Sequence, residues 1–110
     1  MNVDAAVTAL AALAQASRLA IFRALVQAGP SGLYAGKISE MTGIAPSALS
    51  FHLKELSHSN LVKSQQQGRF VIYTANYSTM NTLLAFLTEN CCGGQSCEQT
   101  TTATDTERIF

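Results

Sequence analysis

The chain has 110 residues, a formal net charge of zero, 47% hydrophobic residues and 13% charged residues. This length fits one domain with a modest core, and the hydrophobic content excludes a chain that is disordered throughout. The low share of charged residues leaves a surface of small polar side chains, which is typical of proteins that bury part of their surface against a partner subunit.

The neutral sum hides an uneven distribution of charge. Residues 1–90 carry six basic and four acidic side chains, a balance of +2, whereas residues 91–110 carry one basic and three acidic side chains, a balance of −2. Between Arg18 and Arg69 only Glu40 and Glu55 are acidic. The sequence therefore permits a locally positive face in spite of the neutral total.

The first stretch of the chain has apolar residues at helical spacing, namely Val3, Val7, Leu10 and Ala14. This spacing predicts a helix over about residues 3–14. The stretch resembles a signal peptide in being apolar and ending in small residues, but it lacks a basic leader and carries Asp4. We therefore expect a cytoplasmic protein, and because no stretch approaches the length of a membrane span we expect no membrane partner.

A second helix is predicted to begin with Ser17 as its N-cap and to end at Gly29-Pro30. Its apolar stripe consists of Leu19, Phe22, Leu25 and Val26. The following segment, PSGLYAG, is rich in turn-forming residues. It is therefore expected to be a turn-rich connection without regular structure.

Two more helices separated by a brief turn are predicted next. The third runs from Lys37 to Met41 with Ile38 and Met41 pointing inward, and Gly43 suits its C-terminal position. Pro46 suits the first position of the fourth helix. The inward face of the fourth helix carries Leu49, Leu53 and Leu56. The opposite face carries Ser47, Ser50, Phe51 and Lys54.

The segment LVKSQQQGRFVIYTA predicts a β-hairpin, because two β-rich runs flank a polar QQQG with Gly68 in the turn. Helical spacing returns from Thr79 to Asn90. The wide apolar arc of this last helix, which includes Met80, Leu83, Leu84 and Leu87, is expected of a helix that packs both on its own domain and on a partner. Beyond Cys97 the composition is that of a loose tail.

The segment from Lys37 to His58 has the order of a helix-turn-helix, and the hairpin directly after it has the place of a wing. In this order, and in the segments SALSFHLKELSHSNLV and GRFVIYTA, the chain resembles the ArsR/SmtB family of metal-responsive winged-helix repressors over about residues 5–90. The resemblance implies a mainly α (α+β) winged helix-turn-helix fold of order α-α-α-α-β-β-α in a homodimer. Residues 1–90 would be the DNA-binding and dimerisation domain, and residues 91–110 a cysteine-containing, metalloid-binding tail.

The resemblance also implies that the fourth helix enters the major groove of double-stranded operator DNA. The expected DNA-contacting residues are Ser47, Ser50, Phe51, Lys54, Lys63 and Arg69, with residues 65–67 beside them in the wing. The first and last helices would pair with those of a second subunit. The expected dimerisation residues are Val3, Val7, Leu10, Leu83, Leu84 and Leu87.

Several of these residues also have simpler interpretations. Lys54 could belong to a solvated helix face, and Arg69 could extend into water from an ordinary hairpin turn. His52 lies beside the leucine stripe, and packing or one hydrogen bond is favoured there over a role in binding DNA or metal. His58 lies near a helix end, where it is expected only to cap the helix favourably. Phe51 is the exception, because an aromatic ring on a polar face needs a partner, and the methyl group of thymine would serve.

All three cysteines, Cys91, Cys92 and Cys97, lie in the segment NCCGGQSC. An odd number of cysteines in a cytosolic protein argues against a disulfide framework. The adjacent Cys91 and Cys92 are expected to project in different directions, and a glycine pair after them would let the chain return Cys97 towards them. Thiolates select soft metals and metalloids. Structural zinc requires four ligands, whereas trivalent arsenic binds three thiolates, so three cysteines with no fourth donor favour arsenite.

The resemblance supports this interpretation with one departure. Well-known arsenic repressors of the family carry cysteines at the start of the helix-turn-helix, in a segment that corresponds here to GLYAGKISE, which has none. The chain is instead similar to members whose arsenic site lies at the end of the last helix. We therefore predict a repressor that binds operator DNA as a metal-free dimer and dissociates when As(III), or alternatively Sb(III), binds the three cysteines. No catalytic cofactor is expected.

Three other functions compete with this prediction. A thiol redox sensor of the same fold would pair Cys97 with Cys91 or Cys92. A cysteine-dependent arsenic-handling enzyme is disfavoured, because the sequence has no Cys-x-x-Cys, no Ser/His/Asp set and no phosphate-binding glycine loop. A winged-helix protein-interaction module would bind no DNA in a salt-dependent way.

Overall fold

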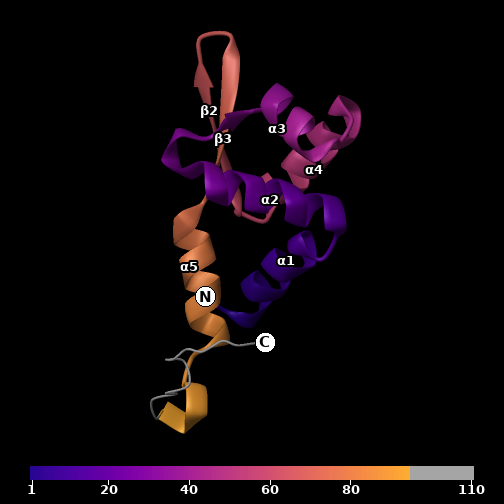
Figure 1. The fold of residues 1–110 in the computed structure, drawn as a ribbon. Coiled ribbons are helices and arrows are strands. Elements are labelled where there is room, and N and C mark those ends of the chain that lie inside the picture. Colours follow the sequence, from indigo (N-terminus) through magenta and orange to yellow (C-terminus); the bar gives the residue numbers. More distant parts are fainter. Residues whose placement is uncertain (95–110) are drawn as a thin grey trace, which may run out of the picture.

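The computed structural model describes residues 1–94 (Figure 1). The elements, in chain order, are α1 (Val3–Leu13), α2 (Ala16–Ala28), η1 (Gly29–Ser31), β1 (Leu33–Tyr34), α3 (Ala35–Thr42), α4 (Pro46–His58), β2 (Val62–Gln67), β3 (Phe70–Ala75), α5 (Tyr77–Leu87) and η2 (Cys91–Gly94). The predicted mainly helical, winged helix-turn-helix fold is confirmed. Figure 1 shows the β2–β3 hairpin at one end of the molecule and η2 at the opposite end, beyond α5.

The N-cap of the second helix lies two residues before the predicted cap, and α2 begins at Ala16. Gln15 has the extended backbone of an N-cap, and its side chain accepts a hydrogen bond from the backbone N–H of Arg18. Ser17 lies inside α2, so its assignment as N-cap is wrong. The cap falls at Gln15 because its side-chain oxygen reaches the exposed N–H three residues on, as capping side chains do.

The helix-turn-helix is formed by α3 and α4, which pack on α2. Gly43 ends α3 with a left-handed φ of 74°, as predicted. The inward leucines of α4 and Ile38 of α3 belong to the core. Met41, however, is 51% exposed, so its predicted inward position is wrong. It is offset from Ile38 by about 60° around the helix axis, which turns it away from the core.

The hairpin belongs to a three-stranded antiparallel sheet of order β1-β3-β2. Leu33 pairs with Tyr73, and Tyr34 pairs with Ile72. The sequence predicted only a turn-rich connection at β1. A two-residue strand is too short to show an alternating pattern, and it forms because the finished hairpin offers β3 as a template.

The last helix begins at Tyr77 and ends at Leu87, earlier at both ends than predicted. Asn76 caps it by accepting from the N–H of Thr79, and its side-chain amide donates to the backbone carbonyl of Asn60 at 3.0 Å. The cap thus fixes the start of α5 against the loop after α4. The predicted division at residue 90 stays a prediction.

The core lies where α1, α2, α4 and α5 converge below the sheet, around Ile21, Leu25 and Leu56. In the part of the chain that the structure describes, no single helix is long and apolar enough to cross a membrane. The segments Val3–Leu13 and Ala16–Ser31 reach that length and hydropathy only when joined across a bend of 99°.

Candidate nucleic-acid interface and cysteine segment

One face of α4 is apolar and buried, and the other is polar and exposed. Leu49, Leu53 and Leu56 face the core, which fixes the rotation of the helix. The four predicted reading residues are all on the exposed side: Ser47, Ser50, Phe51 and Lys54. Phe51 is 56% exposed, and the edge of its ring contacts the ring of His52 with centroids 5.5 Å apart. The structure therefore presents the predicted set together.

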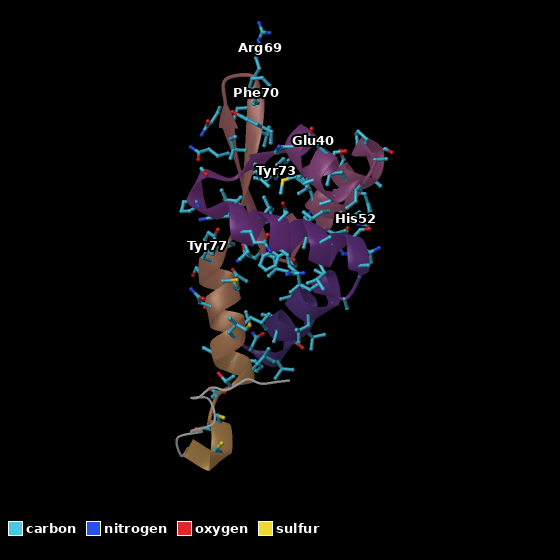
Figure 2. All side chains as sticks on the ribbon, viewed as in Figure 1. Glu40, His52, Arg69, Phe70, Tyr73 and Tyr77 are labelled. Atoms are coloured by element: carbon cyan, nitrogen blue, oxygen red, sulfur yellow. The ribbon has the colours of Figure 1, made fainter. Side chains whose placement is uncertain are left out.

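The hairpin presents the predicted wing residues to solvent. Lys63 and Arg69 are both exposed, and Figure 2 shows Arg69 at the tip of the hairpin, pointing away from the body. Next to it, the rings of Phe70 and Tyr34 lie 5.1 Å apart. This contact joins the last residue of β1 to the first residue of β3, so it stabilises the hairpin from the side on which α3 begins.

A hollow of about 190 Å³ separates α4 from the wing. It is lined by Ser50, Leu53, Lys54, Ser57, Ser64 and Tyr73. Hydroxyl groups and one ammonium group around a recess form a suitable environment for a DNA phosphate. Ser57, Ser64 and Tyr73 were not predicted from the sequence, although Ser57 follows Ser50 and Lys54 at helical spacing and could have been found from that pattern.

The basic side chains on this face are available for a polyanion. Within residues 1–94, the one ion pair is between Lys37 and Glu40, whose Nζ and Oε1 atoms lie 3.2 Å apart. Lys54, Lys63 and Arg69 take part in no ion pair there. Their charges can therefore act on DNA without first breaking a protein contact.

The two histidines occupy different positions on α4. The Nδ1 atom of His52 lies 3.3 Å from Nη1 of Arg18 on α2, which confirms the predicted single hydrogen bond. His58 lies in the last turn of α4, as predicted.

A second apolar surface lies on α1 and α5. Five of the six predicted dimerisation residues are between 41% and 63% exposed: Val3, Val7, Leu10, Leu84 and Leu87. Leu83 is only 5% exposed and packs in the core of its own chain, so its assignment to a dimer surface is wrong. On α1 it is the small Ala6 and Ala9 that face the core, which leaves the larger side chains outside.

The segment η2, which holds Cys91 and Cys92, follows α5 at the end of the molecule far from the wing (Figure 1). Cys91 and Cys92 are both exposed in η2, and their Sγ atoms lie 3.6 Å apart. The expectation that they project in different directions is wrong. Cys92 has a left-handed backbone (φ 57°, ψ 34°), which turns its side chain back towards Cys91.

The third predicted ligand, Cys97, lies outside the described residues. In the described range, no group of three or more His, Cys, Asp or Glu side chains lies close enough to hold a metal ion. The structure thus brings two of the three predicted sulfurs together.

Comparison with known proteins agrees with this geometry. A family model described as a helix-turn-helix domain matches residues 13–65. The chain is 29% identical over 91 residues to the HTH-type transcriptional regulator YgaV of Escherichia coli K12, covering 83% of this chain and 90% of YgaV.

Two solved structures have similar folds. The ArsR-like transcriptional regulator from Rhodococcus sp. RHA1 is 25% identical with a TM-score of 0.68, covering 76% of each chain. NolR from Sinorhizobium fredii is 30% identical with a TM-score of 0.62, covering 80% of this chain and 85% of NolR.

Proposed function

Because this chain belongs to the ArsR family of winged helix-turn-helix transcriptional regulators, we propose that it is a cytoplasmic repressor that binds operator DNA as a homodimer and releases it when trivalent arsenic binds Cys91, Cys92 and Cys97. Its fold and relatives are those of DNA-binding regulators, not enzymes. The proposal that arsenic is the inducer rests on one observation, which is that all three cysteines of the chain follow α5 closely in the sequence.

The exposed face of α4 and the basic wing support the DNA-binding part. An α-helix fits the major groove, and Ser50, Phe51 and Lys54 reach base edges from the exposed side of α4. Lys63 and Arg69 contact phosphates or the minor groove from the wing. The hollow between these elements accommodates one phosphate of the backbone.

Dimerisation is supported by the exposed apolar side chains of α1 and α5. A second copy of the chain would cover Val3, Val7 and Leu10 on α1 together with Leu84 and Leu87 on α5. Burial of such side chains is the main driving force of association. The dimer then sets two copies of α4 about one helical turn of DNA apart.

The geometry of the cysteines fits a soft, multi-thiolate ligand. Sulfurs that share one zinc ion lie about 3.8 Å apart, given bonds of about 2.3 Å and tetrahedral angles. The sulfurs of Cys91 and Cys92 lie 3.6 Å apart in this structure, where Cys92 is disulfide-bonded, so reduction would leave two thiols close enough to share one ion. Cys97 follows only five residues after Cys92, across Gly93 and Gly94. Arsenite, and by the same chemistry antimonite, would take the three thiolates as inducer.

Arsenic binding would act on DNA binding through α5. The cysteine segment follows the end of this dimerisation helix, so closing a three-sulfur site changes the direction in which the end of the helix is held. A small rotation between subunits spoils the spacing of the two reading helices. A coupling of about 1–3 kcal/mol, which is usual for effectors, would weaken DNA binding by about 5- to 150-fold.

The test is a fluorescence-anisotropy titration of a duplex from upstream of the gene, with and without arsenite and under reducing conditions. Arsenite should release the parent protein from the duplex and leave Cys97→Ser bound. Ser96→Ala, a neighbouring change that removes no thiol, should respond like the parent. An unchanged response of Cys97→Ser would reject the three-sulfur site.

A redox-sensing repressor is the second candidate, and one observation favours it. Cys92 is disulfide-bonded in this structure. Thiol pairing at the end of α5 would constrain the same helix end. Release of DNA by peroxide, reversed by dithiothreitol and unaffected by arsenite, would select this function over the first.

A further inference from the structure

Arg18 joins three helices through two hydrogen bonds of its guanidinium group. Its Nε atom donates to the carbonyl oxygen of Ala12 at 2.7 Å, and its Nη1 atom lies 3.3 Å from Nδ1 of His52. Both contacts are partly buried. Ala12 is in the last turn of α1, where carbonyl groups have no partner within the helix. A single side chain of α2 therefore connects the end of α1 with the recognition helix.

The direction of the second hydrogen bond determines the state of the imidazole ring. A guanidinium group only donates and stays charged, so Nδ1 of His52 must accept. The ring is then neutral, with its hydrogen on Nε2. The same ring contacts Phe51, the exposed aromatic residue of the reading face, with centroids 5.5 Å apart. Figure 2 shows His52 beside the corner between α1 and α2.

We propose that Arg18 and neutral His52 are positioning residues that hold the recognition helix at a fixed angle to α1. The proposal rests on the proposed function, since α1 belongs to the dimer surface and α4 to the DNA-reading surface. The pair transmits the orientation of the dimer surface to the DNA-reading surface. The contact between His52 and Phe51 extends this effect to Phe51, the side chain expected to contact a base. Neither residue touches DNA in this role.

The connection depends on a free acceptor at Nδ1 of His52. Removing this acceptor would leave the guanidinium group of Arg18 without its partner on α4. The other charged side chains on α4 and on the elements that contact it are Asp4, Arg23, Lys37, Glu40, Lys54, Glu55 and Lys63. Lys37 and Glu40 pair with each other, and none of the seven has a hydrogen bond or ion pair with His52. Arg18 is thus the charged group that responds to the state of this ring.

The DNA test compares two substitutions at the two histidines of the chain. His52→Leu places an apolar side chain there and removes the atom that accepts from Arg18, so operator affinity, measured by anisotropy, should fall by about tenfold because one charge-assisted hydrogen bond is lost. His58→Leu is the matched control and should bind like the parent. Unchanged operator affinity in His52→Leu would overturn the proposal.

Two variants separate positioning from simple stability. Asparagine carries its Oδ1 where histidine carries Nδ1, so His52→Asn should keep operator affinity. Arg18→Met should lose about tenfold in operator affinity, whereas Arg23→Met, an exposed change on the same helix, should lose less. A His52→Asn protein that loses as much affinity as one without an acceptor at this position would contradict the role of His52.

A measurement without DNA keeps this test separate from that of the proposed function. Nitrogen-15 NMR of the His52 ring in the full chain should show hydrogen on Nε2 and a bare Nδ1, and Arg18→Met should change that pattern. If the duplex fails to bind at all, the proposed function fails while the ring state still decides whether the connection exists. A hydrogen on Nδ1 would overturn the proposal.

Discussion

Gly32 lies directly against the backbone of Tyr73. A β-carbon on Gly32 would stand 2.5 Å from the carbonyl oxygen of Tyr73 and 2.7 Å from Cγ2 of Ile72, and the φ of Gly32 is +68°. The close approach arises because β1, which follows at once, pairs with β3. Glycine is therefore required at the point where the helical part of the chain joins the sheet.

Replacing this glycine should destabilise the fold. Gly32→Ala is expected to lower the free energy of unfolding by about 2–4 kcal/mol, because it adds backbone strain and forces β1 away from β3. Urea denaturation measures the change. Gly36→Ala is the matched control, since its β-carbon meets nothing within 4 Å and alanine favours the helix by up to about 1 kcal/mol. Equal destabilisation by both substitutions would contradict this account.

Charge on the apolar surface of α1 or α5 should separate the subunits. Val7→Glu and Leu87→Glu each place a carboxylate where a second copy would bury an apolar group, and both parent residues are more than half exposed. Sedimentation equilibrium should then show monomers. Met41→Glu changes a similarly exposed residue on α3 and should leave the dimer intact. Dimers of unchanged affinity in Val7→Glu would place the interface elsewhere.

The wing and the recognition helix should contribute differently to DNA binding. Arg69→Ala is expected to reduce the slope of log affinity against log salt by about 0.9, the effect of one phosphate contact, and to weaken operator and random DNA alike. Phe51→Ala should leave that slope unchanged and lower the preference for operator by about 1 kcal/mol or more. Anisotropy titrations at several salt concentrations distinguish the two. If Arg69→Ala lost the preference for operator over random DNA and Phe51→Ala kept it, the roles assigned to the two residues would be reversed.

The number of sulfurs should determine which arsenical is sensed. A methylated arsenical needs two thiolates, and the sulfurs of Cys91 and Cys92 lie only 3.6 Å apart. Cys97→Ser should therefore lose about tenfold or more in affinity for arsenite, at least about 1.4 kcal/mol, and keep its affinity for methylarsenite. Titration of DNA release with each compound under reducing conditions checks this. If Cys97→Ser loses both responses, the first two cysteines do not form a site by themselves.

Much of the fold and of the candidate interface could be predicted from local patterns. The leucine repeat of α4 predicted both the buried face and the exposed set opposite, because one rotation about the helix axis decides both. Gly43 predicted a helix end because glycine adopts the left-handed conformation without steric cost. The cysteine count favoured a three-thiolate ligand independently of the fold, since donor number and softness belong to the residues themselves.

What remained undecided depended on neighbours that are distant in the sequence. Leu83 and Leu84 are adjacent residues of the same type. Only the packing of α5 on α1 and α2 decided that Leu83 is buried in the core and that Leu84 is exposed. The strand β1 exists because β3 offers it hydrogen bonds, and the link from Arg18 to His52 spans 34 residues of chain. The sequence by itself determined which chemical groups the protein carries and the order of its elements. The tertiary structure decided which of those groups meet, because packing brings together residues whose separation along the chain carries no information about contact.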